Sequence, residues 1–382
     1  MIRILTATTR ELDDVQAAVD EITAALDPEN NLLKNSLGLI ACFAEFGETG
    51  ALKAICDALP FECIGTTTCL SAVGQEIDQM ILAITVLTSD DCEFPTALIN
   101  IDDDYEANIN TSVNALLTQS AVKPSVLLGY FPLLNTKGGD LMLMAIDRVT
   151  GGIPVFGTVA VDHNIDYVAS QTIYNGVMYR EAMVLGAVCG TVNVSFEIAA
   201  LNEDKIRKQK AIITESNGNL LLGVNGKSVQ KYLEDIGLMQ AELGMGIVPF
   251  VVEHKDGTKA VARAVYTFTP EGHAVCGGLM PEGATLAIGR VDADDVLHTT
   301  EHAMKQLIDD SGDSVILCYS CLARYLALGL NVTTEAEIVK KTADGADYHF
   351  AYSGGEICPL YDPDGNLRNY FHNYSIVFCK LS

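Results

Sequence analysis

Ser125-Val126-Leu127-Leu128-Gly129-Tyr130 is an apolar run that decides the fold class, together with the two segments after it. Gly138-Gly139-Asp140 opens a stretch that reaches Val149 with apolar residues at helical spacing, and Ile153-Pro154-Val155-Phe156-Gly157-Thr158 is the next apolar run. Runs of this length between helical stretches are typical of buried strands. The order strand, helix, strand predicts a sheet that is covered by helices.

The same order fills most of the first half of the chain. Strands are predicted at residues 2–7, 37–43, 61–65 and 81–86, and helices at residues 11–26, 49–59 and 105–121. The pattern changes after residue 171, where apolar runs are separated by Asn-Gly or Gly-Thr turn signals. These runs lie at residues 172–174, 177–188 and 192–198. They indicate consecutive antiparallel strands, so the first half is predicted to contain a mixed sheet.

The most charged stretch of the chain, residues 202–210, separates two halves. We predict a domain boundary there, with an N-terminal domain at residues 1–203 and a C-terminal, ligand-binding domain at residues 204–382. In the second half, strands are predicted at 211–214, 220–224, 247–252, 260–267, 285–288 and 314–319, and helices at 228–236 and 294–307. The predicted fold class is α+β, with two domains that each contain a mixed or mostly antiparallel sheet with packed helices.

The composition narrows the classes of partner. The 382 residues include 50 acidic and 24 basic side chains, which gives a formal net charge of −26. A field of this sign repels nucleic-acid phosphates and anionic lipid surfaces, so we expect no nucleic-acid partner. No apolar run is long enough to span a membrane, so we expect no membrane insertion. The 11 cysteines lie mostly inside apolar strings, which is typical of reduced thiols in a cytoplasmic protein.

No motif for a cofactor or a metal stands out. Gly244-Met245-Gly246 leads into an apolar run of strand type, which is the wrong order for a dinucleotide-binding turn. Gly138-Gly139-Asp140 lacks the Lys and Ser/Thr of a nucleotide-binding loop and fits a simple helix start. His298 and His302 lie on one face of a predicted helix but lack the spacing of a zinc site. We therefore expect no cofactor and no metal, and we assign no catalytic residue.

The densest group of polar and special-geometry residues lies near the C-terminus. It consists of Ser320-Cys321-Leu322-Ala323-Arg324, Gly354-Gly355-Glu356-Ile357-Cys358-Pro359 and His372-Asn373. Each piece lies at the edge of an apolar run, where a strand would end. Because strand ends are where α/β proteins gather ligand-contacting groups, we expect the three pieces to converge around a small zwitterion or polar acid.

The residue types suggest a role for each member of this group. Arg324 begins a predicted helix, and its guanidinium is suited to a ligand carboxylate. Glu356 comes after two glycines that allow a tight backbone approach and unusual φ angles, and its carboxylate is suited to a ligand ammonium. His372 and Asn373 supply donors and acceptors to other polar groups, and Cys321 is expected to line the pocket.

Two further hypotheses concern Arg263 and Cys321. Arg263 interrupts the apolar run at residues 260–265, so we expect it at an edge or in the site rather than buried. Cys321 precedes a predicted helix, whose N-terminus favours a thiolate, so a cysteine-dependent enzyme with Cys321 as nucleophile and His372 as base is the alternative to a receptor. Side chains of adjacent residues on a strand point to opposite faces, which speaks against Asn373 as the residue that orients His372.

At these residues the chain resembles the FIST domain family, the F-box and intracellular signal transduction proteins. The C-terminal resemblance includes Arg263, Pro281-Glu282-Gly283, Ser320-Cys321-x-x-Arg324, Glu335, Gly355-Glu356-Ile357-x-Pro359 and His372-Asn373. The N-terminal resemblance includes residues 39–43, Gly65-Thr66-Thr67-Thr68 and residues 157–162. The resemblance covers nearly the whole chain, with an N-terminal and a C-terminal FIST half in one stand-alone protein.

The resemblance implies a sensory role in signal transduction. Family members are expected to bind small ligands, with amino acids as the proposed class, and to act beside signalling outputs. The expected partners are therefore a small-molecule ligand and a signalling protein. Whether the chain is also an enzyme is left open by the sequence, with a binding protein favoured.

Overall fold

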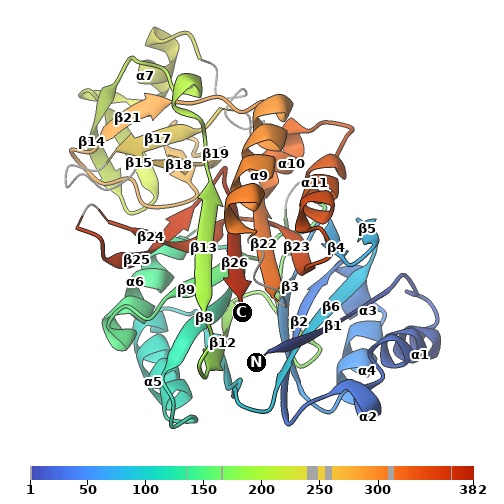
Figure 1. Ribbon diagram of the computed structural model, residues 1–382. Coiled ribbons are helices and arrows are strands. Elements are labelled where there is room, and N and C mark those ends of the chain that lie inside the picture. The colour runs from blue at the N-terminus through green and yellow to red at the C-terminus, as the bar shows by residue number, and fades with distance from the viewer. Residues whose placement is uncertain are drawn as a thin grey trace.

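The computed structural model describes residues 2–134, 136–164, 167–238, 248–253, 260–308, 314–362 and 364–382. It confirms the predicted α+β class, with 26% of residues in helices and 39% in strands. Within these residues the strands form four sheets, and the helices pack on their outer faces (Figure 1). The turn at Gly244–Gly246 lies outside the described residues.

The first sheet has the strand order β1-β6-β2-β3-β10-β11. Its strands are β1 (Arg3–Thr9), β2 (Asn35–Cys42), β3 (Glu62–Thr67), β6 (Leu82–Ser89), β10 (Thr172–Tyr174) and β11 (Val177–Tyr179). β2 and β3 run parallel, and the other neighbours are antiparallel. The helices on this side are α1 (Val15–Leu26), α2 (Pro28–Asn31), α3 (Glu45–Glu48) and α4 (Ala51–Ala58). Buried residues of α1 and α4, such as Ile22 and Ile55, pack against the sheet in an aliphatic core.

The second sheet has the order β25-β24-β9-β8-β12-β7. It contains β7 (Thr96–Asn100), β8 (Pro124–Phe131), β9 (Val155–Val159), β12 (Ala182–Cys189), β24 (Glu356–Tyr361) and β25 (Leu367–His372). β8 and β9 are parallel. Helices α5 (Tyr105–Leu117) and α6 (Gly139–Thr150) cover one face through a core that includes Val113 and Met142.

The third sheet has the order β13-β26-β22-β23-β4-β5. Its strands are β4 (Ser71–Val73), β5 (Glu76–Asp78), β13 (Val194–Ala199), β22 (Val315–Cys321), β23 (Asp347–Ser353) and β26 (Ile376–Leu381). β22 and β23 are parallel. The helices are α9 (Ala293–Leu307), α10 (Leu322–Ala327) and α11 (Thr334–Ala343).

These three sheets share one plan, in which a parallel strand pair connected through helices lies among antiparallel neighbours. Their inner faces meet in a common core, to which β2, β8 and β22 contribute Leu39, Leu128 and Leu317. Tyr130 and Tyr319 lie in the same core, with their hydroxyl oxygens 3.1 Å apart. The β-α-β order at residues 125–158 was therefore interpreted correctly, as β8, α6 and β9.

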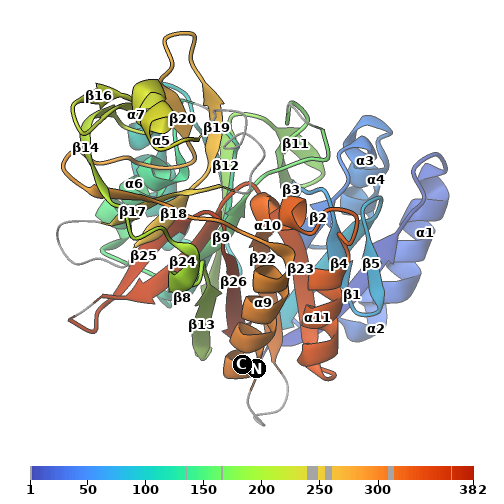
Figure 2. The ribbon, with the colours of Figure 1, turned by 90° about the horizontal axis from the view of Figure 1, so that it is seen from above.

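The fourth sheet is antiparallel and lies above the other three in Figure 1. Its order is β18-β17-β21-β14-β15-β20-β19, and β16 pairs with β15. The strands are β14 (Ala211–Asn217), β15 (Leu220–Val224), β16 (Lys227–Ser228), β17 (Phe250–Glu253), β18 (Val261–Arg263), β19 (Val265–Phe268), β20 (Ala274–Cys276) and β21 (Thr285–Ile288). Helix α7 (Val229–Asp235) packs on it through Val229 and Leu233. Figure 2 shows the same unit from above.

The sheets take strands from both sides of the predicted boundary at residues 203 and 204. β13 pairs with β26, β4 pairs with β23, and β24 pairs with β9. The charged stretch at residues 202–210 contains only a short 3-10 helix, Glu203–Lys205. The boundary itself stays a prediction.

Two local expectations need comment. The apolar run at residues 177–188 forms two strands, β11 and β12, which a bend at residues 180 and 181 separates. All 11 cysteines are free and buried, as expected for reduced thiols. Within the described residues no helix combines the length and the hydropathy that a membrane span needs.

Candidate functional site at the strand ends

The carboxyl ends of the parallel strand pairs meet at one place. Past the end of β3, Thr68 Oγ1 donates to the carbonyl oxygen of Tyr352 on β23, at 2.9 Å. Thr158 on β9 donates to Ser353 Oγ at 2.7 Å. The Val161 amide donates to the carbonyl oxygen of Thr67 at 3.3 Å. Strands from all three sheets therefore deliver the residues at their ends to a common region, which is where open α/β folds place ligands.

Glu356 is fully buried in this region without an ion pair to a base among the described residues. It begins β24, where it faces Thr158 on one side and His372 on the other. Its Oε2 accepts hydrogen bonds from the hydroxyl (2.8 Å) and the amide (3.4 Å) of Ser375, whereas its Oε1 has no hydrogen-bond partner. Burial raises the pKa of Glu356 to about 8, although Ser375 and Arg324 oppose this shift. The carboxyl group is therefore largely protonated at neutral pH.

Two neighbours of Glu356 also carry buried polar atoms that lack a partner. The amide nitrogen Nδ2 of Asn373 has none, although its Oδ1 accepts from the Ala264 amide at 3.3 Å. The hydroxyl of Tyr374 has none either. Tyr374 has φ = 60°, an unfavourable backbone conformation for a side chain of this size. Such atoms are rare in protein interiors, and each of them calls for an explanation.

Cys321 is the last residue of β22 and lies directly before α10. Its side chain is buried, and burial, followed by the nearby Glu356, raises the pKa of its thiol well above the usual range. The thiol in turn contributes to the raised pKa of the Tyr266 and Tyr374 phenols, for which burial is the main cause. These shifts place the thiol, the carboxyl group and the two phenols around one buried region.

Arg324 is buried and directed at Glu335 rather than at Glu356. Its Nη2 lies 2.8 Å from Glu335 Oε1, and its Nε donates to the same oxygen at 2.9 Å. Its Nη2 also donates to the carbonyl oxygen of Val296 and to the Thr300 hydroxyl. Glu335 accepts a further hydrogen bond from Ser320 at 2.7 Å. In this structure the guanidinium therefore binds α9 and α11, and its predicted contact with a ligand stays a prediction.

Arg263 lies on the edge strand β18, as expected, but it is 3% exposed, so the expectation that it is not buried was wrong. Its Nη2 lies 3.3 Å from Asp140 Oδ1, and its Nη1 donates to the carbonyl oxygen of Phe371 at 2.9 Å. Asp140, at the start of α6, also accepts a hydrogen bond from the Leu279 amide. Burial is possible because the carboxylate and the carbonyl oxygens replace water around the guanidinium.

His372 and Asn373 are both buried, at the end of β25. The Nε2 atom of His372 lies 3.1 Å from the carbonyl oxygen of Cys358. Because His372 is the cross-strand partner of Glu356, the two side chains lie on the same face of the sheet. The high thiol pKa of Cys321 gives the cysteine-dependent enzyme no support, because the thiolate is the nucleophilic form.

The two glycines before Glu356 allow a close approach of the backbone rather than a positive φ. A Cβ atom at Gly355 would collide with the Phe371 ring, and one at Gly354 would come within 2.9 Å of the Ala160 carbonyl oxygen. Neither glycine has a positive φ. The predicted tight approach is thus confirmed, and the predicted unusual φ was wrong.

A cavity of about 570 Å³ adjoins this region. It is lined by Leu133, Leu134, Tyr167, Ser170, Arg180 and Glu181. The Leu133 side chain lies next to Gly354, and Ser170 donates to the buried carboxylate of Asp162 at 2.8 Å. Burial raises the pKa of Tyr167, and Cys69, Asp162 and then Cys321 add to this shift. The cavity is therefore lined by residues of the N-terminal half of the chain, and it lies next to the segment that leads into Glu356.

Four residues of this region were not predicted from the sequence, namely Tyr167, Tyr266, Tyr374 and Ser375. Tyr374 and Ser375 come directly after His372-Asn373, so the motif could have been extended by two residues. Tyr266 lies three positions after Arg263, and it donates to the carbonyl oxygen of Gly354 at 3.2 Å. No signal in the sequence pointed to Tyr167. No metal-binding cluster of three or more His, Cys, Asp or Glu side chains occurs in the described part of the chain.

Comparison with protein families agrees with this architecture. The FIST N domain matches residues 36–227, and the FIST C domain matches residues 228–359. The protein belongs to the FIST family, whose domains are sensory domains of signal-transduction proteins. The two matches meet inside β16, a strand of the fourth sheet. No curated protein matches the chain.

Proposed function

We propose that this protein senses a small zwitterion of the amino-acid class, which binds at the carboxyl ends of the strand pairs. The observation that carries the proposal is the gathering of Glu356 Oε1, Asn373 Nδ2 and the Tyr374 hydroxyl, all buried and all without a partner. Leaving one such atom unsatisfied costs about 1–3 kcal/mol. A ligand that supplies the missing hydrogen bonds recovers this free energy.

The atom types define complementary roles. Glu356, once ionised, accepts the ligand ammonium, and Asn373 Nδ2 and the Tyr374 hydroxyl donate to the ligand carboxylate. Cys321 lines the same region. His372 stands beside Glu356 on the sheet and is proposed to contact a polar group of the ligand.

Arg324 and Arg263 remain part of the proposed binding set, in a supporting position. The bonds of Arg324 to Glu335 fix the start of α10, which directly follows Cys321. The bond of Arg263 to the Phe371 carbonyl oxygen fixes the end of β25, which carries His372 and leads to Asn373. Direct contact of either guanidinium with the ligand would require it to leave its present partners.

The cavity beside Tyr167 and Leu133 offers the ligand a route to the buried atoms. Its volume of about 570 Å³ is within the usual range for small-molecule sites. We propose that the sensed ligand enters here and that a signalling protein in the cytoplasm responds to the occupied state.

Isothermal titration of the purified protein against the twenty amino acids tests the proposal. We expect at least one to bind, and Glu356→Gln and Asn373→Ala to weaken that binding by tenfold or more. Glu301→Gln, on the exposed face of α9, is the matched control and should bind as the parent does. Silence with all twenty amino acids, or unchanged affinity in both site variants, contradicts the proposal.

A further inference from the structure

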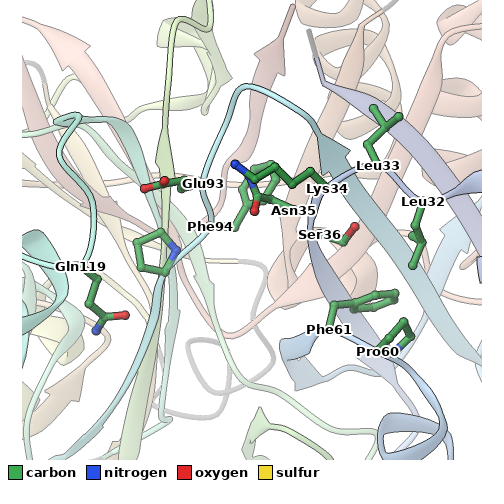
Figure 3. A pocket seen from close by; sticks show the side chains of 11 residues that line it. Leu32, Leu33, Lys34, Asn35, Ser36, Pro60, Phe61, Glu93, Phe94 and Gln119 are labelled. Carbon is green, nitrogen blue, oxygen red and sulfur yellow. The ribbon is translucent and has the colours of Figure 1, made fainter.

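A second cavity lies at the opposite end of the same strands. Its volume is about 530 Å³, and it is lined by the start of β2, by residues that precede β2, β3 and β7, and by Gln119 after α5 (Figure 3). The lining residues used below are Lys34, Asn35, Phe61, Glu93 and Phe94. Because β2 and β3 are parallel, their amino ends at this cavity lie a full strand length from the carboxyl ends at Glu356. The cavity is therefore separate from the site of the proposed function.

A cation and a carboxylate face the same space in this cavity. Lys34 and Glu93 both line the cavity, the Lys34 side chain extends toward Glu93 in Figure 3, and both residues are exposed. Neither side chain has an ion-pair partner among the residues that the structure describes. Both nevertheless line the same cavity. Two opposite charges that share a cavity without forming an ion pair are complementary to a ligand with a charge at each end.

Apolar side chains supply part of the remaining lining, beside the polar Asn35, Ser36 and Gln119. The apolar part comes from the rings of Phe61 and Phe94 and from Leu32, Leu33, Pro60 and Pro95. Phe94 is 8% exposed, so its ring forms part of the floor rather than the rim. Apolar walls with a few placed polar groups are the usual composition of small-molecule sites.

Hydrogen bonds hold the walls in place. Asn35 Nδ2 donates to the Cys92 carbonyl oxygen at 2.8 Å, which connects the Lys34 wall to the Glu93 wall. The Leu33 amide donates to Thr88 Oγ1 at 2.8 Å, and the Lys34 amide to Asp90 Oδ1 at 3.1 Å. A cavity that is already ordered loses little conformational entropy when a ligand binds.

We propose that this cavity is a second binding site, for a zwitterion with an apolar body. Lys34 pairs with its carboxylate, Glu93 pairs with its ammonium, and Phe61 and Phe94 contact the apolar part. Two sources share this chemistry, a free apolar amino acid and a short apolar peptide with free ends. The volume of the cavity favours the peptide.

The test uses the full chain with Glu356→Gln, so that the site of the proposed function is silenced. The titrated probes are L-leucine, L-phenylalanine, the dipeptide Leu-Phe with free ends, and the same dipeptide acetylated and amidated. We expect the free dipeptide to bind most tightly and the blocked dipeptide at least tenfold more weakly. Adding Lys34→Gln and Glu93→Gln should weaken binding of the free dipeptide by tenfold or more.

The matched control adds Glu301→Gln and Lys305→Gln, which remove one carboxylate and one ammonium from an exposed ion pair on α9. This variant should bind as the Glu356→Gln parent does. The proposal is overturned if the parent binds none of the probes, if the blocked dipeptide binds as well as the free one, or if the cavity and control variants bind alike. Tighter binding of a single amino acid than of the dipeptide would assign the site to free amino acids. Because Glu356 is already replaced, none of these results depends on the first proposed site.

Discussion

At the scale of single residues, the clearest physical conflict is the buried carboxyl group of Glu356. An ionised carboxylate in the interior needs a partner of opposite charge or several hydrogen bonds, and Ser375 supplies only two, one of them long. The protein avoids the cost by keeping the group protonated, which is the meaning of a pKa of about 8. Ionisation at higher pH, or a bound ammonium, then changes the stability of the whole fold.

We predict that stability falls as pH rises from about 5 to 8, in part because of Glu356. Its pKa is about 8 in the folded protein against an ordinary value of 4.5, so the folded state binds more protons in this window. Because the unfolded state binds fewer protons, the free energy of unfolding decreases as the pH rises, by at most ~1.4 kcal/mol per pH unit from this group. Urea unfolding from pH 5 to 9 measures it. Glu356→Gln should flatten the slope, and an identical slope in that variant would refute the assignment.

We predict that Cys321 does not react with iodoacetamide in the folded protein at neutral pH. Its thiol is 3% exposed, and burial raises its pKa well above the usual range, so almost no thiolate is present. Mass spectrometry after timed labelling measures this, with the urea-unfolded chain as the control in which Cys321 should react fully. Rapid and complete labelling of native Cys321 would instead favour the cysteine-dependent enzyme.

At the scale of elements, a buried ion pair fixes three helices and a strand around the C-terminal site. Arg324 on α10 and Glu335 on α11 are 3% and 0% exposed, and their further partners are on α9 and β22. Because α10 is only one and a half turns long, it gains little stability by itself, and the ion pair sets its position. The pair therefore controls where Cys321 sits relative to Glu356.

We predict that Arg324→Met and Glu335→Leu each lower the free energy of unfolding by about 3–5 kcal/mol, because each leaves the other charge buried without a partner. The double variant should cost clearly less than the sum, because no uncompensated charge remains. Urea unfolding of all four proteins measures the coupling. The exposed pair Arg10–Glu76, changed to Met and Leu, is the control and should show at most about 1 kcal/mol. Additive costs at Arg324 and Glu335 would contradict the prediction.

At the scale of the whole molecule, the fourth sheet is joined to the second through Arg263 and Asp140. This ion pair connects β18 to the start of α6, and the glycines at 277 and 278 leave room for it and for Asn373. The same junction carries the Tyr266 hydrogen bond to Gly354 and the Asn373 bond to Ala264. The residues of the proposed site and the fourth sheet therefore share contacts at this junction.

We predict that Asp140→Asn loosens this junction at a cost of about 1–3 kcal/mol, because a charge-assisted bond to a buried guanidinium is lost while the shape is kept. Hydrogen exchange should speed up in β17, β18 and β21 and stay unchanged in β1 and β6. Asp103→Asn, at an exposed carboxylate that pairs with Lys137, is the control. Faster exchange in all sheets alike would mean that the ion pair stabilises the molecule without being specific to the junction.

Much of the fold is determined by local sequence, whereas the membership of the site stays a prediction. Residues 125–158 predicted β8, α6 and β9 because apolar periodicity reports which face of an element is buried, and this depends only on neighbouring residues. The family resemblance placed Arg324, Glu335, Glu356 and His372 in one set. The high cysteine content within apolar runs likewise predicted buried free thiols, and all 11 are buried.

Only the tertiary structure decided which charges meet. The sequence suggested that Arg324 and Glu356 face one ligand, whereas the folded chain pairs Arg324 with Glu335 and leaves Glu356 with Ser375. The sequence also did not predict that strands from the two sides of residue 203 pair with each other, or that a cavity lies at Tyr167. Both features arise from contacts between residues far apart in the chain. Local pattern determines which element each segment forms and which face it buries, but a partner in a buried ion pair is selected by packing geometry, which no short stretch of sequence contains.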